Sequence, residues 1–111
     1  MTGLSPFEGE TGVSGTPTFS WDPYPGATTY VIWLSDTSGE TGVWGIRTLS
    51  AVTSIDYGST SGTILQPPTE YPLLPNTTYG WYLLALDSNN WCISDNRLPG
   101  GTPLDTFTTG P

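Results

Sequence analysis

The sequence contains no histidine and no lysine, and its single cysteine is Cys92. Without histidine and lysine, the chain lacks the most common general base, the amine of Schiff-base chemistry and the imidazole ligands of many metal sites. A single cysteine excludes an internal disulfide, and we interpret Cys92 as a small, buried, hydrophobic side chain. These absences predict a protein that is not an enzyme and that binds no cofactor.

Positive charge is also scarce, since two arginines stand against ten carboxylates and give a formal net charge of −8. No basic stripe exists to neutralise the phosphates of a nucleic acid or the headgroups of an anionic membrane. No apolar run approaches the ~20 residues of a transmembrane helix. The opening stretch, "MTGLSPFEGETG", has neither a positive n-region nor an apolar h-region, so it is not predicted to be a signal peptide. We therefore expect no nucleic-acid partner and no membrane insertion.

Strong helix formers are few, whereas 14 glycines and 11 prolines interrupt helices. No segment repeats its apolar residues with the period of a helix, so helix content near zero is predicted. Strand-like runs separated by turn residues occur instead, at residues 5–9, 16–21, 28–36, 43–50, 62–66, 73–87 and 105–109. Their spacing predicts one domain, residues 1–111, built as an all-β, two-sheet antiparallel β-sandwich of about seven strands.

Two of these runs carry a resemblance to a known family. "SWDPYPGATTYVIWLSD", residues 20–36, resembles the B strand, turn and C strand of a fibronectin type III domain. "LLPNTTYGWYLLALD" is similar to the family's Leu-x-Pro-x-Thr-x-Tyr-x-Val-x-Val-x-Ala run, which is matched here by Leu73, Pro75, Thr77, Tyr79, Trp81, Leu83 and Ala85. The resemblance extends over residues 5 to 109 and implies a fibronectin type III-like, immunoglobulin-like sandwich. The long segments on either side of residues 73–87 depart from the family pattern, so their loops are not carried over.

The resemblance implies a structural role for several residues. Tyr79 would be the tyrosine corner, with its ring buried and its hydroxyl bonded to backbone near Leu73 to Pro75. Trp21 would end the second strand, and Tyr30 would face the core beside it. Period 2 then directs Trp81, Leu83, Ala85, Ile32 and Phe107 into the same core.

The alternate side chains of these two strands are also apolar, although the outer face of an antiparallel sheet is usually polar. If the C and F strands are neighbours, as the resemblance implies, Val31, Trp33, Tyr82 and Leu84 form one outward surface. We expect Trp44 or Ile46 to extend it. Two interpretations stay open: the loop that carries Trp91 folds over this surface as a second small core, or the surface docks a neighbouring domain, another copy or a carbohydrate.

Residues 87–96 gather oxygen ligands suited to calcium, with Asp87, Asn89 and Asp95 as candidates beside Asn90 and Asn96. Their spacing is not that of an EF-hand, and Asn and Asp are ordinary turn residues, which is the interpretation we favour. "NTT" at Asn76 fits the glycosylation acceptor pattern, but it also marks a turn between sheets. Carboxylates near each other in sequence, such as Asp36 and Glu40, lack the deep cleft that a glycosidase needs.

The lysine-free, acidic composition, rich in Thr, Ser and Gly, resembles that of bacterial or archaeal surface proteins. We therefore expect a non-catalytic structural, spacer or adhesion module of a multidomain protein, located outside the cell or on its surface. Its partners would be neighbouring domains of the same protein or another protein. The alternative is a ligand-binding module that uses exposed aromatic side chains to bind carbohydrate or a protein. Buried tryptophans would favour the spacer, and exposed coplanar tryptophans the binding module.

Overall fold

Every regular element in the described part of the chain is a strand. The computed structural model describes residues 3–37, 41–95 and 105–111, and within them no helix is long and apolar enough to cross a membrane. The nine strands are β1 (Glu10–Val13), β2 (Thr18–Ser20), β3 (Thr29–Ser35), β4 (Gly42–Thr48), β5 (Ser54–Asp56), β6 (Gly62–Gln66), β7 (Thr78–Leu86), β8 (Cys92–Asp95) and β9 (Asp105–Thr109). The predicted all-β class is confirmed.

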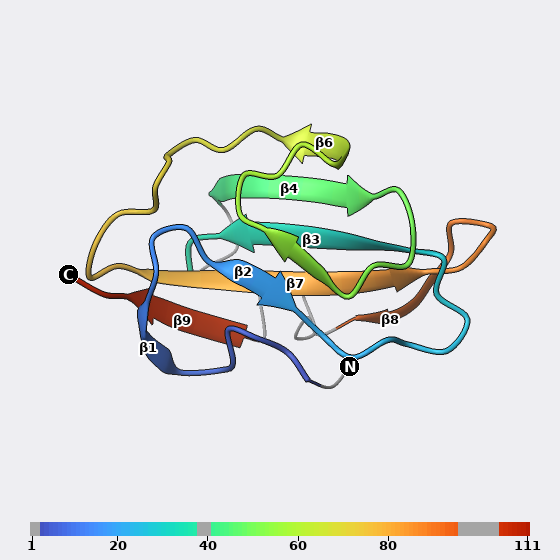
Figure 1. Ribbon diagram of the computed structural model, residues 1–111, viewed down its shortest axis with the longest axis horizontal. Helices are drawn as coiled ribbons and strands as arrows, with labels where there is room; N and C mark the ends of the chain where they lie inside the picture. The colour runs from blue at the N-terminus through green and yellow to red at the C-terminus, as the bar shows by residue number, and fades with distance from the viewer. Residues whose placement is uncertain (1–2, 38–40, 96–104) are drawn as a thin grey trace.

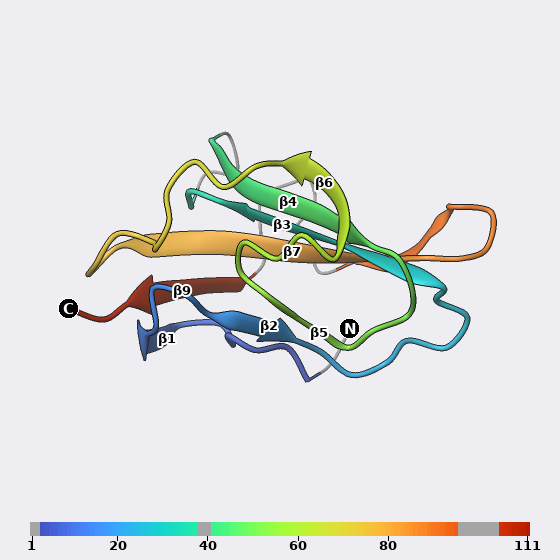
Figure 2. The ribbon, with the colours of Figure 1, turned by 45° about the horizontal axis from the view of Figure 1, so that its top comes forward.

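The strands form two sheets of unequal width. The large sheet has the order β1-β9-β7-β3-β4-β6, with β8 also paired to β7, and the small sheet contains only β2 and β5. Figure 1 shows the small sheet lying across one face of the large one, and Figure 2 shows β2 and β5 in a separate layer. This arrangement is of the β-sandwich type. All pairs are antiparallel except β1 with β9, which run parallel.

The strand count differs from the predicted seven because short strands depend on partners rather than on local pattern. β1, β5 and β8 contain three or four residues each, too few to show an alternation of their own. Conversely, residues 5–9 form no strand, and Ser5 makes only an isolated bridge with Ser20. This segment is still fastened to the core, since the Trp81 indole N–H donates to the Pro6 carbonyl at 3.1 Å.

Aromatic rings fill the space between the sheets. Phe19, from the small sheet, lies with its ring centroid 5.9 Å from Trp44, 4.9 Å from Trp81 and 6.1 Å from Phe107 on the large sheet. All four side chains are buried. Each buried aromatic removes roughly 150–250 Å² from water, which at ~25 cal/mol/Å² is an upper bound of several kcal/mol apiece. Contacts between strands far apart in sequence therefore hold the layers together.

Trp21 and Tyr30 form a second aromatic contact at the end of the core, with ring centroids 5.1 Å apart. Both rings are buried. The Tyr30 hydroxyl accepts the Tyr24 N–H at 2.9 Å, and the Tyr30 N–H donates to the Thr48 hydroxyl at 2.9 Å. Tyr30 thus joins the turn before β3 to the end of β4.

Candidate functional site

The outward surface predicted on two neighbouring strands exists as a geometric feature. β3 pairs antiparallel with β7, which places Val31 opposite Leu84 and Trp33 opposite Tyr82. Directly opposite residues of paired strands share one face, so these four side chains lie together. The alternate residues Ile32 and Leu83 are fully buried on the other face, whereas the four outward side chains are half-buried.

Part of the cover over this surface comes from two glycines of β4. Trp33 lies opposite Gly45, and a Cβ built on Gly45 would overlap the Trp33 ring atoms Cε3 and Cζ3. A Cβ on Gly42 would lie 2.9 Å from Trp33 Cζ2. The indole therefore occupies the space that side chains at these two positions would fill. Such close approach of a side chain to backbone is a reason for glycine within a strand.

The prediction that Trp44 or Ile46 extends the outward surface is wrong. Trp44 pairs with Leu34 and Ile46 pairs with Ile32, and all four side chains are fully buried in the core. The outward position between them is Gly45, and the next one is Arg47. The register between β3 and β4 thus assigns the large apolar residues of β4 to the core.

The Trp91 side chain does not pack on the outward surface, and the rest of the loop expected to cover that surface includes residues 96–104, which lie outside the described residues. Trp91 lies in the hairpin between β7 and β8, which projects at one end of the molecule (Figure 1). Its side chain is 72% exposed. The prediction that Cys92 is buried is wrong, because Cys92 is exposed at the start of the short strand β8, opposite Leu86.

The hairpin that carries Trp91 is held by Asp87. The Asp87 N–H donates to the Trp91 carbonyl at 3.0 Å, and Oδ1 of Asp87 accepts the N–H groups of Asn89 at 2.9 Å and Trp91 at 3.0 Å. Asn90 adopts a left-handed φ of 64°, which Asn tolerates better than most residues. The Arg47 guanidinium donates to the Asn90 side-chain oxygen. The hairpin tip is therefore held by hydrogen bonds within the hairpin and by one hydrogen bond to β4.

These contacts bear on the calcium candidates. Oδ1 of Asp87 and the side-chain oxygen of Asn90 already accept hydrogen bonds within the protein. Among residues 3–37, 41–95 and 105–111, no group of three His, Cys, Asp or Glu side chains could hold a metal ion. Asn96 lies outside the described residues, as do Glu40 and the side chain of Asp95. The geometry that is present is that of a turn.

The Tyr79 hydroxyl lies where the resemblance implies it. The ring is buried, and the hydroxyl accepts the Leu74 N–H at 3.0 Å, between Leu73 and Pro75. It also donates to the carboxylate of Glu70. Burial, followed by this bond to Glu70, raises the pKa of Tyr79 to about 12. Asn76 has a left-handed φ of 52° and donates its N–H to Gly110 at 3.0 Å, so it does form the expected turn.

Glu70 organises this region, and its role was not predicted from the sequence. Its backbone carbonyl accepts the hydroxyl of Tyr57, whose ring stacks on Tyr71 with centroids 5.5 Å apart. Burial, and then the charge of Glu70, raises the pKa of Tyr57 to about 12. The contacts of Glu70 could not be predicted from local sequence, because its partners, Tyr79 on β7 and Tyr57 after β5, lie elsewhere in the chain.

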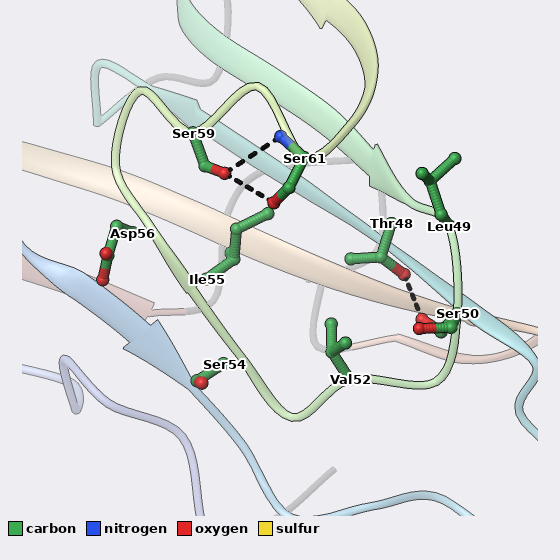
Figure 3. A pocket seen from close by; sticks show the side chains of 9 residues that line it. All are labelled: Thr48, Leu49, Ser50, Val52, Ser54, Ile55, Asp56, Ser59 and Ser61. Atoms are coloured by element: carbon green, nitrogen blue, oxygen red, sulfur yellow. Dashed lines mark hydrogen bonds between the residues drawn. The ribbon is translucent and has the colours of Figure 1, made fainter.

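A hollow of about 240 Å³ opens beside β5 (Figure 3). Its lining is mostly hydroxyl-bearing: Thr48, Leu49, Ser50, Val52, Ser54, Ile55, Asp56, Ser59 and Ser61. The Ser59 and Ser61 hydroxyls lie 2.8 Å apart, and the Thr48 hydroxyl donates to the Ser50 carbonyl at 2.7 Å. Asp56 accepts the Thr18 hydroxyl at 2.7 Å. The one carboxylate in the lining thus has an internal partner.

No family model, curated protein or solved structure matches the chain.

Proposed function

We propose that this chain is a fibronectin type III-like module that serves as a non-catalytic spacer or adhesion unit of a multidomain extracellular or cell-surface protein. Its partners would be neighbouring domains of the same protein or another protein. The fibronectin type III assignment is supported by the β3–β7 pairing and by the bond from the Leu74 N–H to the Tyr79 hydroxyl. Both features match what the sequence resemblance implies for the C strand, the F strand and the tyrosine corner.

The observation that carries the spacer proposal is the placement of the tryptophans. Trp21, Trp44 and Trp81 are buried, and Trp33 is half-buried against Gly42 and Gly45. Only Trp91 is largely exposed, so the chain offers no row of coplanar exposed indoles on which a sugar chain would stack. The aromatic side chains stabilise the core of a domain that lacks disulfides.

The described carboxylates support the same proposal. Glu8 accepts the Thr106 N–H at 2.8 Å, Glu10 accepts the Phe7 N–H at 3.1 Å, and Asp36 accepts the Thr41 N–H at 3.4 Å. Glu70 and Asp87 accept bonds from Tyr79 and from the hairpin backbone. These acids cap turns and fasten loops, which is a structural use.

Trp91 is the observation that favours the alternative, a ligand-binding module. A hydrogen-bonded hairpin presents this indole to solvent, and its neighbours in the hairpin, Ser88 and Asn89, are exposed polar residues. An aromatic face flanked by hydrogen-bonding groups suits a neutral sugar or the pocket of a protein partner.

Affinity electrophoresis separates the two functions. The chain is run in native gels that contain a soluble neutral polysaccharide, with xylan, a β-glucan and a soluble cellulose derivative as the panel. The spacer proposal expects the same mobility in every gel. Retardation that is lost in Trp91→Ala, and kept in the control Tyr71→Ala, another exposed aromatic, would overturn it in favour of the binding module.

A further inference from the structure

β6 is an open edge of the large sheet. In the described part of the chain only β4 pairs with it, and its other side is not bordered by any strand (Figure 1). Its five residues, Gly-Thr-Ile-Leu-Gln, include no charged side chain and no proline. Unpaired backbone N–H and C=O groups along such an edge are a template for pairing with another strand.

The other described edges carry features that discourage such pairing. β1, β5 and β8 contain Glu10, Asp56 and Asp95, so each edge includes a carboxylate residue. The remaining edge strand, β2, is bordered by the N-terminal segment, where Ser5 and Ser20 exchange two backbone hydrogen bonds of 2.9 Å. Charges and covering segments are the devices with which proteins protect sheet edges. β6 has neither.

The side chains of β6 are also incompletely covered. Ile64 pairs with the fully buried Ile46 and therefore faces the core side of the sheet, yet it is 37% exposed. The small sheet contains only two strands, and both views draw β6 at the top edge of the molecule, away from β2 (Figures 1 and 2). Leu65, the extra residue where the register with β4 shifts, is 47% exposed. Apolar area thus lies beside the open backbone.

We propose that β6 pairs antiparallel with β6 of a second copy of this chain, so that two large sheets join into one continuous sheet. Two-fold pairing of one strand with itself is self-complementary, and it covers Ile64 and Leu65 of both copies. Paired strands lie about 4.8 Å apart, so a carboxylate on the pairing strand would face the carboxylates of its copy. Residues 57–69 contain no charged residue, which makes β6 an edge at which two chains of net charge −8 can meet.

The expected dimer is weak. An interface built around one strand of five residues belongs to the smallest class of protein contacts. The net charge of −8 on each copy opposes association over longer distances, and salt screens that repulsion. Dimerisation should therefore strengthen as the ionic strength rises, which is opposite to the behaviour of an interface built on salt bridges.

Sedimentation velocity measures this directly, at chain concentrations from about 10 μM to about 1 mM, the range in which a small interface associates. The wild-type chain should shift from monomer to dimer across this range, and it should do so at lower concentration in 0.5 M than in 0.05 M sodium chloride.

Leu65→Lys places a charge on the β6 edge and should raise the dissociation constant of the dimer at least tenfold. The matched control is Leu74→Lys, which makes the same change at an exposed leucine outside the strands and away from β6. It should leave the dissociation constant within about twofold of wild type, since surface charge alone has small effects.

Circular dichroism and thermal unfolding establish that both variants are folded. If Leu65→Lys unfolds, hydrogen exchange of the wild-type chain replaces it: the amides of residues 62–66 should exchange more slowly at high than at low concentration. A wild-type chain that stays monomeric throughout overturns the proposal. So does a dimer that Leu65→Lys leaves intact, or one that both lysine variants weaken equally.

Discussion

At the scale of single residues, the Tyr79 hydroxyl joins β7 to the connection that precedes it. It sits on β7, accepts the backbone N–H of Leu74 and donates to the carboxylate of Glu70. Glu70 in turn accepts the hydroxyl of Tyr57 through its carbonyl. One side chain thus links the sheet to the segment that crosses from β6 to β7.

We expect Tyr79→Phe to lower the free energy of unfolding by about 1–3 kcal/mol, because the part-buried Leu74 N–H loses its acceptor and the Glu70 carboxylate loses its donor while the ring is kept. Urea denaturation measures the change. Tyr71→Phe is the control, since Tyr71 is exposed and its hydroxyl makes no hydrogen bond in the described structure. Equal stability of the Tyr79 variant and the wild type would contradict the prediction.

Alkaline pH tests the same residue. The pKa of Tyr57 and of Tyr79 is about 12 in the fold, above the ordinary value of about 10. A raised pKa favours the neutral phenol in the folded state, so its stabilisation is complete below pH ~10 and is lost as the pH rises toward ~12. The urea midpoint should fall across this window, and it should fall less in Tyr79→Phe. A fall of the same size in both proteins would mean that other groups cause it.

At the scale of elements, the packing of β3 against β4 depends on Trp33 lying over Gly45. This contact contributes to the half-burial of an outward tryptophan that no strand of the small sheet covers within the described residues. It also explains a glycine in the middle of β4, where a β-branched residue would otherwise be favoured.

We expect Gly45→Ala to destabilise the protein by about 1–3 kcal/mol, because the new methyl group must displace the Trp33 ring. In a Trp33→Ala background the same change should cost little, or should stabilise the strand by removing a flexible glycine. A double-mutant cycle from urea unfolding gives the coupling energy between the two sites. Equal effects of Gly45→Ala in both backgrounds would show that the indole does not lie on this glycine.

At the scale of the whole molecule, the tryptophans divide into protected and accessible groups. Trp21, Trp44 and Trp81 lie in the core, Trp33 is half-buried, and Trp91 is exposed at the hairpin tip. Acrylamide, which is neutral and so is not repelled by the net charge of −8, should quench only part of the emission. Trp91→Phe should remove most of the readily quenched component, while Trp33→Phe removes a smaller part. Unchanged quenching in Trp91→Phe would contradict the exposed hairpin tip.

The long strands could be predicted because their information is local. Period-2 alternation places Tyr30, Ile32, Trp81 and Leu83 on one face, and the structure buries all four. Alternation cannot decide which face of the next strand shares that core. The register between the two strands decides which face of the next strand joins the core, and a shift of one residue exchanges the two faces. The pairing of Leu34 with Trp44 therefore settled the orientation of β4, against the prediction.

The sequence by itself determined the all-β class, the alternation along β3 and β7, and the turn at Asn76, because each depends on residues adjacent in the chain. Only the tertiary structure decided that β1, β5 and β8 are strands, that Glu70 meets Tyr79, that Trp33 lies on Gly45, and that Trp91 and Cys92 face solvent. These features depend on contacts between distant segments. They could not be predicted from the sequence because a short strand or a single polar side chain has no local periodicity that identifies its partner.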